Sequence, residues 1–409
     1  MKLPAPPNDH RPPGVGPRQR SSWSACLPAK QRPQPGEALV VGVLPGEGVG
    51  PEVVGAALEV LGRVADAAGL DTEIAFGGAI GREAERACGQ PLSDEVLTFC
   101  EDILARGGAI VNGPGGGRYV YDLRHRLDLF LKISPLQVEN GLPDASPIRP
   151  ETLQGVDLLL TRENTGGAYQ GVWGEGRDAA GQRRAEHRIS YLEPHVQRFL
   201  DASARLACSR RGELSVVWKE AGVPSISQLW QACAERAAQA HGVRLRMVDV
   251  DLMAYRLIRE PAAFDVVAAP NLFGDVLADL GAVLLGSRGL SYSGNFGERG
   301  EGVYQTNHGA AYDLAGSDRA NPAAQILALA MMLRESFGRM REARAVEEAL
   351  RSVWCAGGRT ADVHVSGAKL VGTREMGRLV AERAASLLRP SPHAAGVPEP
   401  RGRLESNPA

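Results

Sequence analysis

Short apolar runs of strand length recur along the chain, and stretches with helical periodicity lie between several of them. This alternation constrains the fold more than any other feature, because strands that alternate with helices are typical of an α/β architecture with a largely parallel sheet. The predicted strands cover 38–44, 109–112, 156–161, 214–218, 245–250 and 264–269. The predicted helices begin at Pro51 and near Pro322, or cover 225–240, 252–259, 339–353 and 374–388.

The composition is that of a globular protein without a strong charge. Hydrophobic residues make up 44% of the 409 residues and charged residues 23%, and the formal net charge of −2 gives no general attraction to nucleic acid or to an anionic membrane. No apolar window reaches the length of a membrane-spanning helix. The six cysteines form no Cys-x-x-Cys pair, which argues against a zinc ribbon and favours a reducing, cytoplasmic location.

The two ends of the chain differ from the part between them. Residues 1–36 are rich in proline and basic residues and contain one acid, so we expect this N-terminal extension to be disordered. A transit peptide would need an amphipathic helix, which the prolines disfavour. Residues 389–409 have a similar composition, and we expect a disordered tail there. The globular unit is therefore predicted to span 37–388.

Polar residues follow the predicted strands, at the edge of the sheet where open α/β folds bind their ligands. Asp275 and Asp279 lie four residues apart, so they share one face of a predicted helix and repel each other. A divalent cation such as Mg²⁺ or Mn²⁺ would remove that repulsion, with Asp251 as a third ligand. The alternative is a solvated helix face with an arginine nearby. The apolar neighbours of the pair favour a site, since unpaired acids beside a core are costly.

Lys219 follows an apolar run and could act as a general base if burial and a metal lowered its pKa. The alternative is a lysine at a strand end whose ammonium group simply reaches solvent. The glycine-rich stretch 46–50 resembles a phosphate loop but lacks the dinucleotide-binding spacing. Arg124, Arg162 and Tyr169 have many structural uses, so none of them indicates a function by itself.

Several segments together resemble one enzyme family, the β-decarboxylating dehydrogenases, which comprise isocitrate, homoisocitrate and 3-isopropylmalate dehydrogenases. They occur in the family's order and spacing over most of the chain. The matching segments are VGVLPGEGVGPEV (41–53), YDLRHRLDLF (121–130), LTRENTGGAYQG (160–171), FDVVAAPNLFGDVLADLGAVLLGSRGLSYSGNFG (264–297) and NHGAAYDLAGSDRANPAAQILALAMML (307–333).

The resemblance implies an α/β, isopropylmalate-dehydrogenase-like fold with two domains and a parallel or mixed sheet, unlike the Rossmann fold. Residues 37–130 and 286–388 would form a discontinuous cofactor-binding domain. Residues 131–285 would form the central domain, which binds substrate and metal and makes the dimer contact. The implied reaction is a metal-dependent, NAD-linked oxidation of a 2-hydroxy dicarboxylic acid, followed by loss of its β-carboxylate.

The resemblance also implies a homodimer with shared active sites and a role for each catalytic residue. Asp275 and Asp279 would hold Mg²⁺ or Mn²⁺, and Asp251 would reach the metal from the partner subunit. Lys219, also from the partner subunit, would deprotonate the substrate hydroxyl. Tyr169 would reprotonate the enol carbon. The metal would polarise the hydroxyl and the ketone and stabilise the enolate.

Arg124 and Arg162 match the family's substrate-carboxylate clamps, since arginine presents planar donors suited to carboxylates. A further set of residues matches the family's cofactor-binding loops. Asp313 in this set favours NAD over NADP, because a carboxylate accepts from ribose hydroxyls and would repel a 2′-phosphate. The cofactor-binding set is Gly46, Gly48, His308, Gly309, Asp313 and Asn321.

The chain departs from the family at positions around the ligands. Ser134 occupies a substrate-binding position where the family has an arginine, so either Lys132, Arg126 or Arg118 replaces that cation or the substrate lacks the usual acid there. A missing charge-assisted contact costs about 1.5–3 kcal/mol. Ala221 replaces an asparagine near the nicotinamide. These changes suggest an unusual substrate.

The segment expected to contact the variable arm of the substrate contains Arg118 and Tyr121. The cation suggests a polar or anionic arm and makes isopropylmalate, with its apolar arm, less favoured than an isocitrate-like or pathway-specific 3-substituted malate. Three alternatives stay open: 3-isopropylmalate dehydrogenase, a malate- or tartrate-type dehydrogenase, and a non-catalytic regulatory subunit of the same family.

Overall fold

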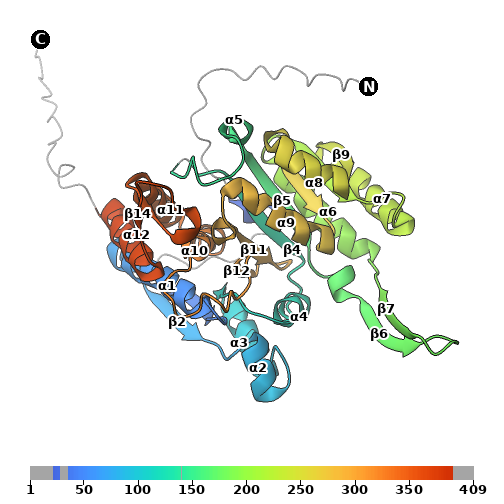
Figure 1. Cartoon of the computed structure of the whole chain (residues 1–409), viewed down its shortest axis with the longest axis horizontal. Coiled ribbons are helices and arrows are strands. Elements are labelled where there is room, and N and C mark those ends of the chain that lie inside the picture. Colours follow the sequence, from blue (N-terminus) through green and yellow to red (C-terminus); the bar gives the residue numbers. More distant parts are fainter. Residues whose placement is uncertain (1–21, 28–35, 140, 390–409) are drawn as a thin grey trace, which may run out of the picture.

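The computed structural model describes residues 22–27, 36–139 and 141–389 (Figure 1). Its centre is a sheet of ten strands in the order β2-β1-β3-β12-β11-β4-β5-β10-β8-β9. Most neighbours are parallel, whereas β4 is antiparallel to both β5 and β11, and β11 is antiparallel to β12. The strands of this sheet are β1 (Leu39–Leu44), β2 (Thr72–Phe76), β3 (Ala109–Asn112), β4 (Leu131–Gln137), β5 (Asp157–Glu163), β8 (Glu213–Trp218), β9 (Arg244–Asp249), β10 (Val266–Ala269), β11 (Tyr292–Phe296) and β12 (Gly302–Thr306).

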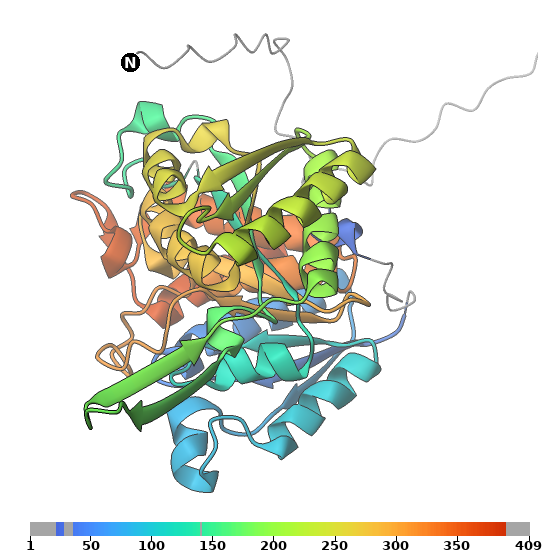
Figure 2. The same ribbon diagram turned by 90° about the vertical axis from the view of Figure 1, so that its right-hand side faces the viewer.

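Helices cover both faces of this sheet (Figures 1 and 2). They are α1 (Gly50–Ala68), α2 (Gly81–Cys88), α3 (Asp94–Ala105), α4 (Tyr119–Arg126), α5 (Pro150–Leu153), α6 (Glu193–Cys208), α7 (Pro224–His241), α8 (Val250–Arg259), α9 (Asn271–Leu285), α10 (Ala323–Glu335), α11 (Met340–Cys355) and α12 (Thr373–Leu388). Short 3-10 helices are η1 (Trp23–Cys26), η2 (Ala168–Gln170), η3 (Pro261–Ala263), η4 (Arg288–Leu290) and η5 (Ala361–Val363). Two small strand pairs complete the fold, β6 (Val172–Arg177) with β7 (Arg183–Arg188) and β13 (Gly358–Arg359) with β14 (Lys369–Leu370).

Strand β1 shows why the sheet is buried on both sides. Its side chains alternate, so Val41 and Val43 join the large core that contains α1, while Leu44 joins the smaller core that contains α3. Gly42 lies under Ile103 of α3, where an added Cβ would come within 3.0 Å of the Ile103 side chain. The α/β class with a mostly parallel sheet is thereby confirmed, and all six strands predicted from apolar runs are present.

Strand β4 was not predicted, although it lies in the middle of the sheet and carries site residues. Its sequence LKISPLQ contains a lysine, a serine and a proline, which are unfavourable in a central strand. The structure accommodates Pro135 because β11 pairs only with 131–133, so the missing N–H lies beyond that ladder. Position 135 pairs with Leu159 of β5 on the other side.

A short part of the N-terminal extension, residues 22–27, packs against the body of the fold. Trp23 is buried at 2% exposure, and the guanidinium of Arg334 lies 4.5 Å from its ring centre. The Ser24 N–H donates to Glu335 Oε2 at 2.8 Å, and Arg205 Nε donates to the Cys26 carbonyl at 2.6 Å. These contacts attach 22–27 to α10 and α6. The remaining residues of the extension up to 35, and the tail from 390 on, lie outside the described residues.

The hairpin β6–β7 projects from the body of the molecule (Figure 2). Every residue of its two strands is exposed, including Val172 and Trp173. Such a ribbon has no core of its own, and two-stranded hairpins are marginally stable in isolation. Within the described residues, no helix is both long and apolar enough to cross a membrane.

Candidate functional site

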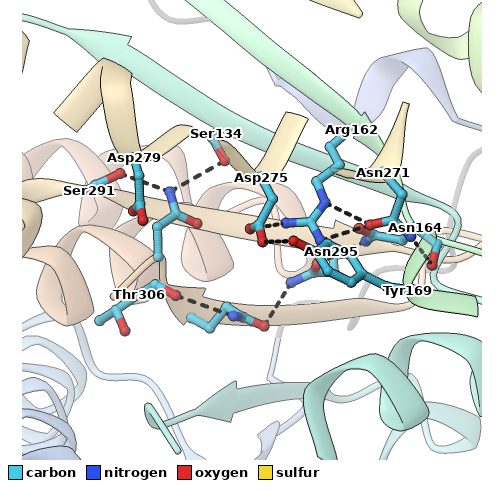
Figure 3. Close-up of polar contacts among 12 residues, drawn as sticks. Ser134, Arg162, Asn164, Tyr169, Asn271, Asp275, Asp279, Ser291, Asn295 and Thr306 are labelled. Carbon is cyan, nitrogen blue, oxygen red and sulfur yellow. Dashed lines mark hydrogen bonds and ion pairs between the residues drawn. The ribbon is translucent and has the colours of Figure 1, made fainter. Parts of the chain in front are cut away.

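Arg162 is the centre of a polar cluster at the carboxyl end of β5 (Figure 3). Its guanidinium forms an ion pair with Asp275 of α9. Its Nε and Nη2 atoms donate to Asn271 Oδ1 at 3.0 and 2.8 Å. The Arg162 side chain is only 3% exposed, so these two acceptors hold a buried charge in one orientation.

Tyr169 reaches the same carboxylate from η2. Its hydroxyl donates to Asp275 Oδ2 at 2.8 Å, and Figure 3 shows the two side chains pointing toward each other. Burial and the Asp275 charge raise the pKa of Tyr169, so the phenol stays protonated at neutral pH. Burial alone would raise the pKa of Asp275, but the charges of Arg162 and Lys132 and the Tyr169 hydrogen bond hold it below its usual value.

An aromatic and cationic group flanks Tyr169. The rings of Tyr121 and Tyr169 are 4.6 Å apart between centroids. The Arg118 guanidinium lies 4.4 Å from the ring centre of Trp173, and its Nη2 donates to the Tyr169 carbonyl at 3.0 Å. Arg118 also forms an ion pair with Asp122 at 3.6 Å. The structure therefore brings the predicted arm-contacting residues together with the predicted acid.

Arg124 and Lys132 are buried cations in the same region, at 4% and 3% exposure. Among the described residues, neither side chain has a hydrogen bond or an ion pair, and the Nε atom of Arg124 is buried without a partner. Burial and the nearby Arg162 lower the pKa of Arg124 to about 10. Burial, Arg124 and Arg162 hold the pKa of Lys132 well below its usual value.

Ser134 lies two residues beyond Lys132 on β4, buried at 2% exposure. Its hydroxyl accepts from Asn307 Nδ2 at a long 3.4 Å. Asn307 also donates to the Ser291 hydroxyl at 2.9 Å (Figure 3). A serine at this position thus supplies a neutral hydroxyl and no positive charge.

Asp279 lies one turn after Asp275 on α9 and forms its own ion pair. Arg288 donates to both of its oxygens, from Nε at 3.2 Å and from Nη2 at 2.9 Å. In the single subunit each of the two acids is therefore compensated by an arginine, as the alternative interpretation of their spacing predicted. Two carboxylates one turn apart also present the oxygen ligands that Mg²⁺ or Mn²⁺ prefers, so the donor set fits such a metal.

Asp251 does not join this pair within one chain. No group of three or more His, Cys, Asp or Glu side chains that could hold a metal ion occurs in the described part of the subunit. Asp251 instead accepts from Lys219 Nζ at 2.6 Å. This hydrogen bond raises the pKa of Lys219, whereas the sequence predicted a lowered pKa, because in the single subunit the amine is partly exposed and has an acid beside it.

The glycine-rich loop 46–50 packs against two other loops. Gly46 and Gly48 have positive φ angles of 81° and 59°, and a side chain there would collide with the carbonyl oxygens of Pro114 and Ala310. The Val49 N–H donates to the Ala310 carbonyl at 2.8 Å. The loop therefore needs glycine to pack closely against the loop that follows β12.

Glu47 ties these loops together. Its carboxylate accepts from the Glu83 N–H at 2.6 Å, the Gly116 N–H at 2.9 Å and the Tyr312 hydroxyl at 2.9 Å. Burial opposes the charge, but these hydrogen bonds outweigh it and lower the pKa of Glu47. The glutamate thereby fixes the loop that carries Tyr312 and the predicted cofactor residues.

The predicted cofactor residues lie along that loop and its continuation into α10. His308 Nδ1 is 2.9 Å from the Gly309 carbonyl, and burial together with Arg288 lowers its pKa, so the ring is neutral at pH 7. Asp313 is exposed on the loop. Asn321 donates to Asp362 at 3.0 Å and accepts from the Ala323 N–H at 3.0 Å. The exposed Asp313 carboxylate is a group that could accept hydrogen bonds from the ribose hydroxyls of a dinucleotide.

The sequence assigned no individual role to Asn271 or Glu47. Asn271 orients Arg162 and also donates to the carbonyls of Asn164 and Gly166, at 3.2 and 2.9 Å. Its position just after Pro270, at the start of a helix that carries two acids, was the available signal. Nothing in the sequence around Glu47 indicates its three donors, because these come from distant segments.

Comparisons with known proteins agree with this geometry. Residues 40–380 match the family model described as isocitrate/isopropylmalate dehydrogenase. The chain is 39% identical over 353 residues to a 3-isopropylmalate dehydrogenase of Synechococcus sp. (strain JA-3-3Ab), covering 82% of this chain and 91% of the relative. It is 37% identical to that of Geobacillus kaustophilus (strain HTA426), covering 82% and 93%.

A solved structure shows the same fold. The crystal structure of isocitrate dehydrogenase from Methylococcus capsulatus matches with a TM-score of 0.75 and 29% identity, covering 85% of this chain and 99% of that one. The family match spans most of the described residues and includes every residue of the site. The chain therefore belongs to the isocitrate/isopropylmalate dehydrogenase family, and it is an enzyme of the NAD-dependent, decarboxylating dehydrogenase class.

Proposed function

We propose that this enzyme oxidises a 3-substituted malate at its hydroxyl carbon with NAD⁺ and then removes the β-carboxylate as CO₂. The observation that carries the proposal is the single cluster that joins Arg162, Asp275 and Tyr169, with Arg124 and Lys132 buried beside it. This cluster combines a protonated phenol, an acid and three cations, which suits a substrate with more than one carboxylate.

The chain's own residues divide the work in this proposal. Arg124 and Arg162 hold substrate carboxylates, since the Arg124 guanidinium has no acceptor within the described residues. Tyr169 keeps its proton, because its pKa is raised, and gives it to the carbon from which CO₂ departs. Asn271 fixes the plane of the Arg162 guanidinium and so positions the clamp.

A divalent metal and NAD⁺ complete the proposed site. Asp275 and Asp279 would hold Mg²⁺ or Mn²⁺, which when bound polarises the substrate hydroxyl and ketone and stabilises the negative charge left by decarboxylation. Gly46, Gly48, His308, Gly309 and Asn321 would line the NAD⁺ site, with Asp313 beside the ribose. The exposed Asp313 carboxylate supports NAD⁺ over NADP⁺, because it would repel a 2′-phosphate.

We further propose a homodimer in which the partner subunit's Lys219 and the partner subunit's Asp251 enter each site, as base and third metal ligand. Exposed apolar side chains on α8 and α9 support this dimer, because exposed apolar surfaces often bind another protein surface. Asp251 and Asp275 lie next to these side chains in the sequence. These side chains are Leu252 at 49%, Tyr255 at 61%, Leu272 at 37% and Val276 at 58% exposure.

The order of strands supports the proposed division into two domains. The strands from 37–130 and 286–388 lie at one end of the ten-stranded sheet, and those from 131–285 lie at the other end (Figure 1). The cluster around Arg162 and the cofactor loops would then belong to different domains that face a common cleft. A cytoplasmic location is also proposed, supported by six cysteines that are all free.

The substrate arm has two candidates. Arg118, held over Trp173 and beside Tyr121, supports a polar or anionic arm of the isocitrate or homoisocitrate kind. The second candidate is 3-isopropylmalate, the substrate in the names of relatives that are 37–39% identical to the chain. Arg118 supports the first candidate even though it is paired with Asp122, because an apolar arm gains nothing from a cation at that place.

The test is a substrate screen with the purified full chain. Isocitrate, homoisocitrate, 3-isopropylmalate, malate and tartrate are each supplied with Mg²⁺ or Mn²⁺ and with NAD⁺ or NADP⁺, and both NADH and CO₂ are measured. Equal amounts of NADH and CO₂ from one 3-substituted malate are expected. NADH without CO₂ would favour a malate- or tartrate-type dehydrogenase, and no NADH from any acid would favour a regulatory subunit.

A further inference from the structure

Three basic side chains lie in the same region of the site, and within the described residues only Arg162 has a hydrogen bond or an ion pair. Arg162 is paired with Asp275 and Asn271. Arg124 and Lys132, both less than 5% exposed, have no hydrogen bond or ion pair among the described residues. Burial lowers the pKa of both side chains, and a bound carboxylate would favour their charged forms, so the site is arranged to receive anionic groups.

The strand register shows where the Lys132 side chain points. Lys132 lies directly opposite Arg162 on β5 and opposite Asn295 on β11. Residues that face each other across a ladder project from the same face of the sheet. Arg162 projects from that face toward Asp275, and the charges of Arg124, Arg162, Asp275 and Asp279 all act on Lys132. The ammonium therefore points into the cluster around Arg162.

The other basic residues near this strand are already engaged. Arg126 is exposed and pairs with Asp94 at 3.3 Å. Arg118 pairs with Asp122 and donates to the Tyr169 carbonyl. Lys132 is thus the buried cation on β4 that remains available to a ligand, within the described part of the chain.

We propose that Lys132 is a substrate-binding residue that holds one carboxylate of the acid, with Arg124 and Arg162 holding the rest of its negative charge. This inference rests on the proposed function and adds a specificity residue to that site. Ser134 lies on the same strand face about 6.6 Å further along, from twice the rise per residue of a strand. A lysine side chain spans that distance, so its ammonium reaches the space above Ser134.

A lysine at this place has a chemical consequence. Its ammonium is a compact charge on a flexible chain, whereas a guanidinium binds a carboxylate with two parallel hydrogen bonds. Lys132 therefore adapts to carboxylates in more than one position. We expect the site to accept malates with different arms, which would place the substrate carboxylate at different positions along β4.

The first test removes the charge. Lys132→Met is compared with the wild type by calorimetry, titrating isocitrate and 3-isopropylmalate into the Mg²⁺-loaded full chain without NAD⁺. Losing one charge-assisted contact should raise the Kd about 10- to 150-fold. Lys369→Met is the matched control, because Lys369 is a surface lysine at 70% side-chain exposure. If Lys132→Met binds within about twofold of the wild type, the proposal is wrong.

The second test restores a cation nearby. The double variant Lys132→Met/Ser134→Arg should regain at least tenfold in affinity over Lys132→Met, and Lys132→Arg should bind better than Lys132→Met. Lys132→Gln replaces Lys132→Met if the latter fails to unfold cooperatively. No recovery in either rescue variant would show that Lys132 acts through folding and would overturn the proposal.

The two proposals fail in different ways. If the wild type binds the acids through Lys132 but makes no NADH, the proposed reaction is wrong and the role of Lys132 stands. If the wild type oxidises an acid with an unchanged KM in Lys132→Met, the reaction stands and the role of Lys132 is wrong. A wild type that binds neither acid overturns both.

Discussion

Asn271 determines the orientation of the charge at the centre of the site. Its side-chain oxygen accepts two hydrogen bonds from Arg162, and its amide donates to the carbonyls of Asn164 and Gly166. All four bonds are at least partly buried, so a substitution leaves donors and acceptors without partners. At this scale the site depends on a neutral amide as much as on its acids.

Asn271→Ala should therefore weaken both substrate binding and folding. We expect the KM for the substrate to rise about tenfold or more, because Arg162 loses its orientation, and the free energy of unfolding to fall by about 1–3 kcal/mol. Steady-state kinetics and urea unfolding measure the two effects. Asn271→Asp keeps an acceptor for Arg162 and should retain a lower KM than Asn271→Ala. Equal KM values in the wild type and Asn271→Ala would refute the positioning role.

A single carboxylate is also expected to select the cofactor. Asp313→Lys replaces a group that repels a 2′-phosphate with one that attracts it, so the ratio of kcat/KM for NADP⁺ to that for NAD⁺ should rise about tenfold or more. Asp66→Asn, an exposed acid on α1, is a control that should leave the ratio unchanged. The same ratio in Asp313→Lys and the wild type would show that Asp313 lies away from the ribose.

At the scale of elements, a strand could be predicted from the sequence where burial in the core determines its residues. It could not be predicted where contacts with distant segments determine its structure. The strands β3, β5 and β8 follow from apolar runs, because burial on both faces of a parallel sheet requires apolar side chains at every position. Apolar runs do not predict β4, since it carries buried polar groups. They do not predict the β6–β7 hairpin either, since its strands are exposed along their whole length. Candidate site residues were predicted where motifs are local, and no individual role was predicted for Glu47 or Asn271 because their partners lie far away in sequence.

The N-terminal segment 22–27 makes an element-scale prediction. Trp23 is 2% exposed and packs with Arg334, so Trp23→Ala should lower the free energy of unfolding by about 3–5 kcal/mol. Urea unfolding of the full chain measures this change. Phe76→Ala, at a position that is 61% exposed, should change it by about 0.5 kcal/mol or less. If Trp23→Ala lowers the free energy of unfolding by less than about 1 kcal/mol, the segment is not part of the core.

Glu47 gives the cofactor loops a pH dependence of known sign. Its pKa is lower in the folded chain than the ordinary 4.5, so the unfolded state binds more protons in that range. The resulting stabilisation is present above pH 4.5 and is lost as the pH falls through the lower, folded pKa. Glu47→Gln should therefore show a shallower loss of unfolding free energy below pH 4.5, measured by urea titrations at several pH values. Identical slopes in both proteins would contradict this role.

At the scale of the whole molecule, we propose that one chain holds only part of each site. Tyr169, Asp275 and Asp279 lie together near α9, whereas Lys219 pairs with Asp251 elsewhere, and no cluster of three metal-binding side chains forms in the described residues. The exposed apolar side chains on α8 and α9 adjoin Asp251 and Asp275 in the sequence, and we propose that a partner subunit covers them. A second copy related by twofold symmetry would bring both groups together twice.

Subunit complementation tests this arrangement most directly. Asp275→Asn and Lys219→Met are each expected to be inactive, and the two proteins are mixed, unfolded, refolded together and assayed with the substrate found in the screen. In a heterodimer one site carries both substitutions and the other carries neither, so random pairing should restore about a quarter of the wild-type activity. If the mixture stays as inactive as its two components, each site is built within one chain and the shared-site account is wrong.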